Sequence, residues 1–393
     1  MFQIGWVDYS REERNKIINI IKLLEGQDTI DELGIGAVRD VFSDFLFPGT
    51  SVLQTRAKYF VLVPYLFQMA QEKGIDDATK VAEYVRRHEE KLVEVLVKNS
   101  PGVDGIIGSR NFKSGKTVKM KPSSIYWNGL RATGILRYPS ASIEAVCGQI
   151  ASSASQHKEI QLKKDDKNKD VEQDDADALR FGPMIFTPIV PTYDVMKETK
   201  IALTLEEGEY LWRQFTSSPV TKDSLMAYML RERRVVDTLF DISANSLDEP
   251  LKGQFILACE FAKFIYGAHL LYNIIFADGC GVNDERVEAE FARWKNDYKL
   301  PPLDDIIHVT KCSVDTAQFF IDFDSAIRTD DISRAKQIVI DRESNVKRGR
   351  EKLKHPENAS YKGPIHFFTL NYRYGTAKTI ISDVLDSLKG KNV

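Results

Sequence analysis

The apolar residues of this chain recur mostly at the three-to-four-residue spacing of a single helix face. Between residues 33 and 47 most of them recur two to four positions apart, which predicts a buried helix. The Pro-Gly pair at 48–49 ends it, because proline clashes with the preceding turn and glycine adopts a positive φ cheaply. Thr50 or Ser51 is expected to cap a second helix, which continues through the apolar block at 59–63.

The second of these helices is predicted to carry cations at its start. Arg56 and Lys58 would lie in its first turns, where each positive charge opposes the helix dipole by about 0.3 to 1 kcal/mol. Both therefore need carboxylate or phosphate partners. We expect an internal salt-bridge network, and the alternative is an anion-binding surface. The carboxylates nearest in sequence are Asp31, Glu32, Asp40 and Asp44.

Similar spacing and capping residues predict a mainly α-helical fold with a multi-helix core. Further helices are predicted at residues 10–25, 76–98, 122–133, 204–215, 224–240, 255–277, 284–297, 313–328, 331–353 and 376–388. The apolar segment 255–277 is long enough to cross a bilayer. It contains Glu260 and Lys263, and a charge near the middle of a membrane helix costs about 2.5 to 3.5 kcal/mol. We interpret it as the central helix of a soluble core.

The segment 105–143 contains no acidic residue, although it is rich in lysine and arginine. Its first half alternates like a short strand pair, and the helix at 122–133 then ends at Gly134. A second short helix is expected to begin at Ser140 or Ser142, which completes an outline resembling a helix-turn-helix or winged helix. We predict a small basic α/β subdomain that contacts nucleic acid, and the alternative is a charged surface without that role. Its basic residues are Arg110, Lys113, Lys116, Lys119, Lys121, Arg131 and Arg137.

Residues 151–180 change to a lysine- and aspartate-rich composition typical of a solvated linker or mobile loop. This predicts an N-terminal helical region at 1–100, the basic subdomain at 101–150, the charged linker, and a C-terminal helical domain at 181–393.

A second basic surface is predicted near the end of the chain. Lys347, Arg348, Arg350 and Lys352 lie close together, and aromatic residues follow at intervals from Tyr361. Lysine and arginine neutralise phosphates, and aromatic rings stack on unpaired bases. The alternative is a helix whose terminal cations interact with its own dipole.

Composition limits the other possibilities. The chain has 393 residues and a net charge of −3, so any contact with nucleic acid must be a local patch. Its four cysteines are widely separated, which argues against structural zinc and a disulfide framework. The first six residues lack the pattern of a signal peptide, and we expect a cytoplasmic protein with no metal, no cofactor and no membrane contact.

Complete catalytic motifs are missing. No Gly-x-Ser-x-Gly elbow occurs, and the stretch 110–117 departs from a phosphate-binding loop because Arg110 replaces the first glycine. Catalytic residues therefore stay unassigned, and a non-catalytic protein is favoured.

Five segments resemble an uncharacterised bacterial family about as long as this chain, for which no activity is established. Some of its members lie near helicase-like genes of anti-phage defence loci. The resemblance implies a role beside such proteins, although it assigns no catalytic residue. The segments are residues 4–10, 31–36 (Asp-Glu-Leu-Gly-Ile-Gly), 46–60, 122–130 and 267–273.

These observations lead to one preferred hypothesis. We expect a non-catalytic accessory subunit of a bacterial defence complex, which contacts DNA or RNA through basic surfaces beside a helicase or nuclease partner. One alternative is an enzyme with an unfamiliar active site near Arg56 and Lys58. Another is a scaffold that binds only proteins.

Overall fold

The computed structural model of the chain describes residues 31–110, 120–165, 184–187 and 191–389. In these residues the chain forms fourteen α-helices and no β-strand, and extended backbone pairs only in a single bridge between Leu136 and Phe186. The prediction of a mainly α-helical fold is confirmed.

The α/β character predicted for residues 101–150 is not supported. The described part of this region contains helices and turns and no strand beyond the single bridge residue Leu136, and residues 111–119, which include most of the expected strand pair, lie outside the described residues. The helix predicted at 10–25 also lies outside them.

Two compact units make up the described chain, and each combines two separate stretches of sequence. The smaller unit joins residues 31–41 to residues 257–370. The larger unit joins the described residues of 42–256 to residues 371–389.

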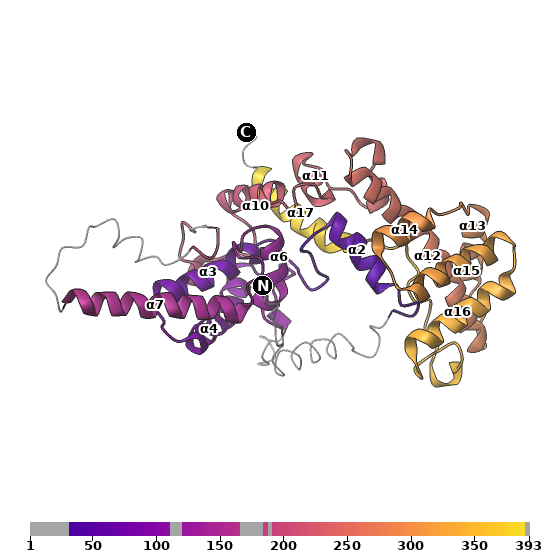
Figure 1. Ribbon diagram of the computed structural model, residues 1–393, viewed down its shortest axis with the longest axis horizontal. Helices are drawn as coiled ribbons and strands as arrows, with labels where there is room; N and C mark the ends of the chain where they lie inside the picture. The colour runs from indigo at the N-terminus through magenta and orange to yellow at the C-terminus, as the bar shows by residue number, and fades with distance from the viewer. Residues whose placement is uncertain (1–30, 111–119, 166–183, 188–190, 390–393) are drawn as a thin grey trace, which may run out of the picture. The chain divides into compact units, whose positions relative to one another are not determined.

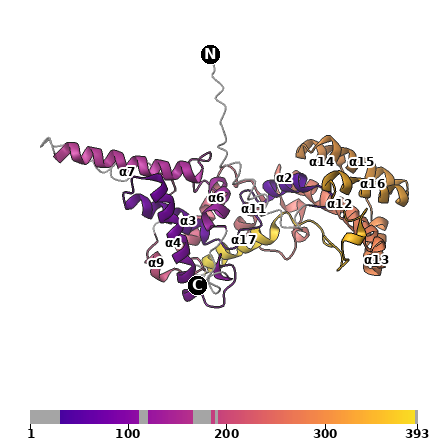
Figure 2. The same ribbon diagram turned by 90° about the horizontal axis from the view of Figure 1, so that it is seen from below.

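Each unit has its own set of helices, labelled in Figures 1 and 2. The larger unit contains α3 (Tyr59–Glu72), α4 (Ala78–Asn99), α6 (Pro122–Ala132), α7 (Ile143–Asp165), α9 (Val195–Glu198), α10 (Leu205–Ser217), α11 (Leu225–Arg231), α17 (Tyr374–Leu388) and the short 3₁₀ turns η1 (Leu239–Asp241) and η2 (Ala244–Ser246). The smaller unit contains α13 (Glu285–Asn296), α14 (Leu303–Thr310), α15 (Val314–Arg328), α16 (Ile332–Lys347) and η3 (Pro356–Asn358). The boundaries between the units fall inside α2 (Gly36–Leu46) and α12 (Leu251–Gly279).

The second helix of the basic region is longer than predicted. The Ser142 hydroxyl accepts a hydrogen bond from the Ala145 amide at 3.0 Å, as a cap does, and α7 then continues to Asp165. It therefore enters the segment 151–180 that was predicted as a linker. No glycine or proline interrupts residues 151–165, and α7 packs against α4, so nothing ends the helix earlier. Residues 166–183 lie outside the described part of the chain.

The connection between α2 and α3 also differs from the prediction. Gly49 adopts a φ of +76°, but the Thr50 hydroxyl donates to the Phe47 carbonyl at 2.6 Å and does not cap α3. The helix begins only at Tyr59. Arg56 and Lys58 therefore lie in the connection before α3, not in its first turns.

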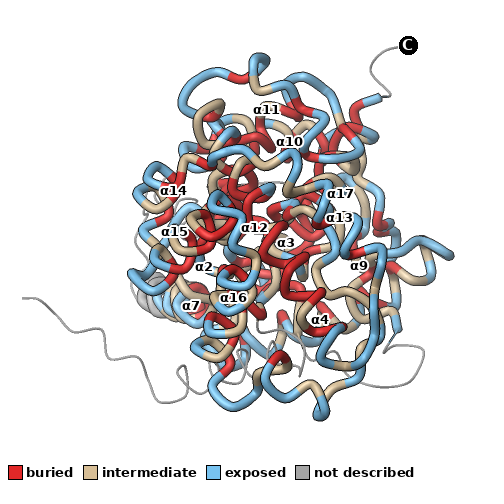
Figure 3. The backbone as a smooth tube through the Cα atoms, turned by 90° about the vertical axis from the view of Figure 1, so that its right-hand side faces the viewer, coloured by how far each residue is buried: buried red, intermediate tan, exposed pale blue. Residues whose placement is uncertain are grey.

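The core of the larger unit surrounds α3. Residues 59–64 of this helix are all buried, a stretch that can be followed in red in Figure 3, because α4, α6 and α7 pack around it. Phe60 makes edge-to-face contacts with Tyr126 on α6 and Phe215 on α10, at centroid distances of 5.1 and 5.2 Å. In the same unit α10 packs on both α11 and α17.

The core of the smaller unit surrounds α12. Phe264 meets Phe320 and Phe323 of α15 edge to face, at 5.9 and 5.7 Å. In the described chain α12 is the one helix long and apolar enough to cross a membrane, and 72% of its most apolar window is buried inside the protein. This burial is that of a core helix.

Helix α6 approaches α3 closely at Gly129. A methyl group there would lie 2.7 Å from the Phe60 ring and 3.0 Å from the Gly49 carbonyl oxygen. We expect Gly129→Ala to lower the free energy of unfolding by about 1 to 3 kcal/mol, because the overlap outweighs the gain in helix propensity. Denaturant titration of the full chain measures this change.

The matched control is Gly148→Ala in α7, where no atom lies within 4 Å of the added methyl group. This variant should be stabilised by up to about 1 kcal/mol. If both variants were equally stable, the close approach of α6 and α3 would be refuted.

Candidate functional site

The described cations of the first basic segment have different environments. Lys121 donates to Glu90 at 2.7 Å, and Arg131 donates to the Ala141 carbonyl at 2.7 Å. These two are therefore engaged within the protein. The side chains of Arg110 and Arg137 are exposed. The other predicted residues, Lys113, Lys116 and Lys119, lie outside the described residues.

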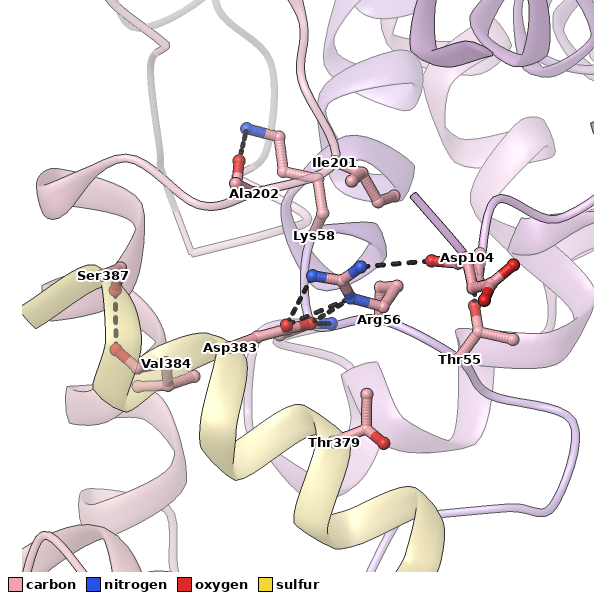
Figure 4. A network of polar contacts seen from close by, with 12 residues as sticks. Thr55, Arg56, Lys58, Asp104, Ile201, Ala202, Thr379, Asp383, Val384 and Ser387 are labelled. Atoms are coloured by element: carbon pink, nitrogen blue, oxygen red, sulfur yellow. Dashed lines mark hydrogen bonds and ion pairs between the residues drawn. The ribbon is translucent and has the colours of Figure 1, made fainter. Parts of the chain in front are cut away.

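Arg56 is held by a carboxylate from the far end of the chain. Its Nε and Nη2 atoms donate to Asp383 on α17 at 2.7 to 3.0 Å, while Nη1 donates to the Asp104 carbonyl at 3.1 Å (Figure 4). The hydrogen bond to Asp383 is the main reason that the pKa of Arg56 is raised. Asp383 also accepts the Ala57 amide at 2.9 Å, so one carboxylate positions both residues.

Lys58 is buried with a different carboxylate. Its Nζ atom donates to both oxygens of Glu207 at 2.6 and 2.8 Å and to the Tyr193 hydroxyl at 2.9 Å. The two charged side chains are only 1% and 2% exposed. Burial lowers the pKa of Lys58, and the Glu207 charge opposes that shift. Glu207 in addition accepts the Thr204 amide at 2.8 Å, which completes the capping box of α10.

Arg56 and Lys58, for which a salt-bridge or anion-binding role was predicted, are thus both paired with internal carboxylates. The partners Asp383 and Glu207 are 327 and 149 residues away in sequence, so the four nearby carboxylates proposed as partners do not fill this role. An external anion would have to displace a carboxylate from Arg56 or from Lys58. This geometry favours a structural role for the pair.

Glu32 organises the second basic region. Its side chain is 4% exposed and lies 3.3 Å from Lys347, 3.4 Å from Lys352 and 3.2 Å from His366. Burial by itself raises the pKa of Glu32, but the His366 hydrogen bond and the two lysine charges outweigh it and lower the pKa to about 2. Two of the predicted nucleic-acid-binding residues, Lys347 and Lys352, therefore have an internal partner.

The helix that carries these residues ends earlier than predicted. Helix α16 stops at Lys347, where Arg348 adopts a left-handed φ of +44° and Gly349 follows at +91°. Beyond them, the fully buried Glu343 carboxylate accepts the backbone amides of Lys352 and Leu353 at 3.1 and 2.9 Å. Arg348 and Arg350 consequently belong to a loop and not to a helix.

The residues 348–368, which we call the basic–aromatic loop, are anchored at both ends. Near the beginning of the loop, Glu343 accepts the amides of Lys352 and Leu353, and Glu32 contacts the Lys352 side chain. At the other end Asn273 of α12 exchanges two hydrogen bonds of 2.6 Å with the Ile365 backbone, and His366 returns to Glu32. The exposed residues of this loop include Arg348, Arg350, Lys354, Lys362, Phe367 and Phe368. The four cations in this group form no ion pair within the described part of the chain.

His269 lies beside the cluster of Lys347, Lys352 and His366 around Glu32. It is 3% exposed, it stacks on His366 at a centroid distance of 5.1 Å, and its Nε2 atom has no hydrogen-bond partner in the described residues. Burial lowers the pKa of His269 to about 4, so the ring is neutral. Among the described residues no group of histidine, cysteine and carboxylate side chains is arranged to hold a metal ion.

Sequence reasoning did not identify the residues that organise these sites. Glu32 was considered only as a partner for Arg56 and Lys58, and Asp383, Glu343 and His366 were not singled out. The predicted start of a helix at residue 204 is the only local signal that pointed to Glu207, which completes the capping box at that start.

The fold and its buried ion pairs define a helical protein whose polar clusters are mostly structural. Comparison with known families adds that residues 1–181 match a family of unknown function, DUF6361. This agrees with the resemblance to an uncharacterised family. No curated protein and no solved structure matches the chain.

The Glu32 cluster leads to a prediction about stability. The change Glu32→Gln leaves Lys347, whose side chain is 8% exposed, without its counter-charge, and we expect a loss of about 3 to 5 kcal/mol in the free energy of unfolding at neutral pH. The folded-state pKa of about 2 lies below the ordinary 4.5, so this stabilisation is present above 4.5 and lost as pH falls towards 2. Denaturant titrations between pH 4.5 and pH 2 should therefore show that acidification lowers the free energy of unfolding less in the variant than in the native chain.

Asp322→Asn serves as the control, because Asp322 and Arg334 form an exposed pair at 3.8 Å. It should change stability by less than about 1 kcal/mol. A Glu32→Gln variant no less stable than this control would contradict a structural role for the buried carboxylate.

Proposed function

We propose that the protein binds nucleic acid without catalysis, and that its basic–aromatic loop makes the contact. One observation carries the proposal: four exposed cations, which form no ion pair among the described residues, share an anchored loop with two exposed phenylalanines. Phe367 and Phe368 are 37% and 55% exposed. Proteins that bind single strands without sequence preference use cations that neutralise phosphates and aromatic rings that stack on unpaired bases.

The anchoring at Glu32 brings the two kinds of residue into one neighbourhood. Lys347 and His366 both contact this carboxylate, at 3.3 and 3.2 Å. Arg348 follows Lys347 in sequence and Phe367 follows His366, so a cation and a ring each lie next to a residue that contacts the same carboxylate. The loop carries five lysine and arginine residues against two glutamates, whereas the whole chain carries −3. The loop therefore attracts phosphate locally.

The resemblance to a family near defence loci supplies the setting of the proposal. In that setting the protein would act as an accessory subunit beside a helicase or nuclease, in a bacterial complex of the anti-phage type. The alternative of an active site at Arg56 and Lys58 has less support, since internal carboxylates already hold both cations.

A double variant tests the cationic contribution. Replacing Arg348 and Arg350 together by glutamine should weaken binding to a fluorescent single-stranded oligonucleotide, because two phosphate contacts are lost. The slope of log affinity against log salt should become shallower by about 1.4. Fluorescence anisotropy at several salt concentrations measures both effects.

The matched control replaces Arg86 and Arg87 on α4, which are 54% and 62% exposed, by glutamine. It removes the same charge from the larger unit and should leave affinity nearly unchanged. Equal affinity for both double variants and the native chain would refute binding by the loop.

A second variant tests the aromatic contribution. Phe368→Ala should reduce single-strand affinity by about 5- to 150-fold, the equivalent of about 1 to 3 kcal/mol of stacking per base, whereas Phe368→Trp should retain binding. Anisotropy titration at fixed salt measures the change. If the alanine and tryptophan variants bound equally well, Phe368 would have no stacking role.

A further inference from the structure

The smaller unit contains a cleft between α12 and α13 whose lining residues lie outside the basic–aromatic loop. Its volume is about 680 Å³, within the range of about 300 to 1,000 Å³ that is common for sites of small organic groups. Side chains of α12, α13 and the residues up to Pro301 line it. We propose that this cleft receives one unstacked nucleotide of a single strand bound by the basic–aromatic loop, an inference that rests on the proposed function.

The aromatic side of the cleft is fixed before any ligand binds. Trp294 packs so closely on α12 that a methyl group at Gly267 would lie 2.1 Å from its ring, and its Nε1 donates to the Lys263 carbonyl at 2.8 Å. Tyr298 lies 5.0 Å from Trp294, and its hydroxyl donates to Asp324 at 2.5 Å. A base entering the cleft therefore does not have to order these side chains, which reduces the entropic cost of binding.

The polar side of the cleft suits a nucleotide more than a simple ion. Three cations and three carboxylates line it, so their formal charges cancel and neither a multivalent anion nor a cation is favoured. Lysine and arginine can meet the single negative charge of a phosphodiester, and carboxylates accept hydrogen bonds from the amino groups of bases. The charged lining residues are Glu260, Lys263, Glu290, Arg293, Asp297 and Lys299.

These cations can be diverted to a phosphate at little cost. Lys263 pairs with Glu260 and Arg293 pairs with Glu290, each at 2.8 Å, but the lysine and arginine side chains are 60% and 72% exposed. Ion pairs this exposed contribute little to stability. In this respect they differ from Lys58 and Lys347, whose buried carboxylates cannot be given up cheaply.

The cleft adjoins the basic–aromatic loop at one ring contact. Tyr266 lines the cleft, and its ring centroid lies 6.5 Å from that of Phe367 on the loop. A strand whose bases stack on Phe367 and Phe368 therefore passes the entrance, and its next base can turn inwards. A duplex cannot offer an unstacked base without breaking a pair, so we expect single strands to be preferred over duplexes of the same sequence.

Photocrosslinking of the full chain identifies which residues the bases touch. A single-stranded oligonucleotide that carries iodouridine, which couples to aromatic side chains under irradiation, is bound and irradiated, and the modified peptides are identified by mass spectrometry. We expect modification of peptides that contain Tyr266, Trp294 or Tyr298, as well as of the loop peptide with Phe367 and Phe368. A duplex of the same sequence should modify the cleft peptides much less.

A matched pair of variants on one helix completes the test. Arg293 lines the cleft and Arg286 does not, yet both lie on α13 and their side chains are 72% and 73% exposed. Each change removes one exposed charge from the same helix, and in the Arg286 variant Asp284 still accepts the backbone amide of residue 286 and the Tyr361 hydroxyl. Arg293→Gln should weaken single-strand binding about fivefold at 0.1 M salt, the value of one phosphate contact, while Arg286→Gln should not.

The outcomes separate the two proposals. Crosslinks to the loop alone, with equal affinities for the two α13 variants, would overturn the cleft and leave binding by the loop intact. Absence of any crosslink and of any binding would overturn both. Crosslinks in the cleft, together with a selective effect of Arg293→Gln, would support the inference.

Discussion

The requirement that a buried charge be neutralised determines much of the smaller unit. Glu32 is almost fully buried, and such a carboxylate is tolerated only when cations and hydrogen-bond donors surround it. Lys347, Lys352 and His366 meet this need from positions 315, 320 and 334 residues further along the chain. The same contacts hold the basic–aromatic loop close to both of its ends, so its exposed residues belong to a constrained segment.

Pairing with internal carboxylates also distinguishes cations that stabilise the fold from cations that are available to bind phosphate. Lys58 is held by Glu207, Arg56 by Asp383 and Lys347 by Glu32, and withdrawing any of these carboxylates leaves charge uncompensated inside the protein. Arg348 and Arg350, in contrast, make no ion pair in the described chain. A count of basic residues along the sequence treats all five alike. Only Arg348 and Arg350 can bind phosphate without giving up an internal carboxylate partner, and the proposed function depends on this difference.

Several segments that carry the family resemblance meet within each unit. In the larger unit, the Tyr126 hydroxyl accepts the amides of Thr55 and Arg56 at 2.8 and 3.0 Å, which joins the segments 122–130 and 46–60. In the smaller unit, His269 of segment 267–273 stacks on His366, which contacts Glu32 of segment 31–36. These contacts fix backbone and bury polar groups, which gives each segment a structural reason for its composition.

Periodicity and capping chemistry were sufficient to predict the helical class and several helix ends. The end of α6 before Gly134, the Ser142 cap of α7, the capping box at Thr204 and the Asp331 cap of α16 all involve residues within four positions of one another, so they can be read locally. The environment of each cation was decided only by the tertiary structure. Lys347 and Arg348 are neighbours, yet the first is buried and the second is exposed. Lys347 pairs with a carboxylate more than three hundred residues away, and the left-handed backbone of Arg348 turns the chain out of the helix. Local patterns give the conformation of a segment, whereas which groups pack against it depends on long-range contacts that those patterns do not contain.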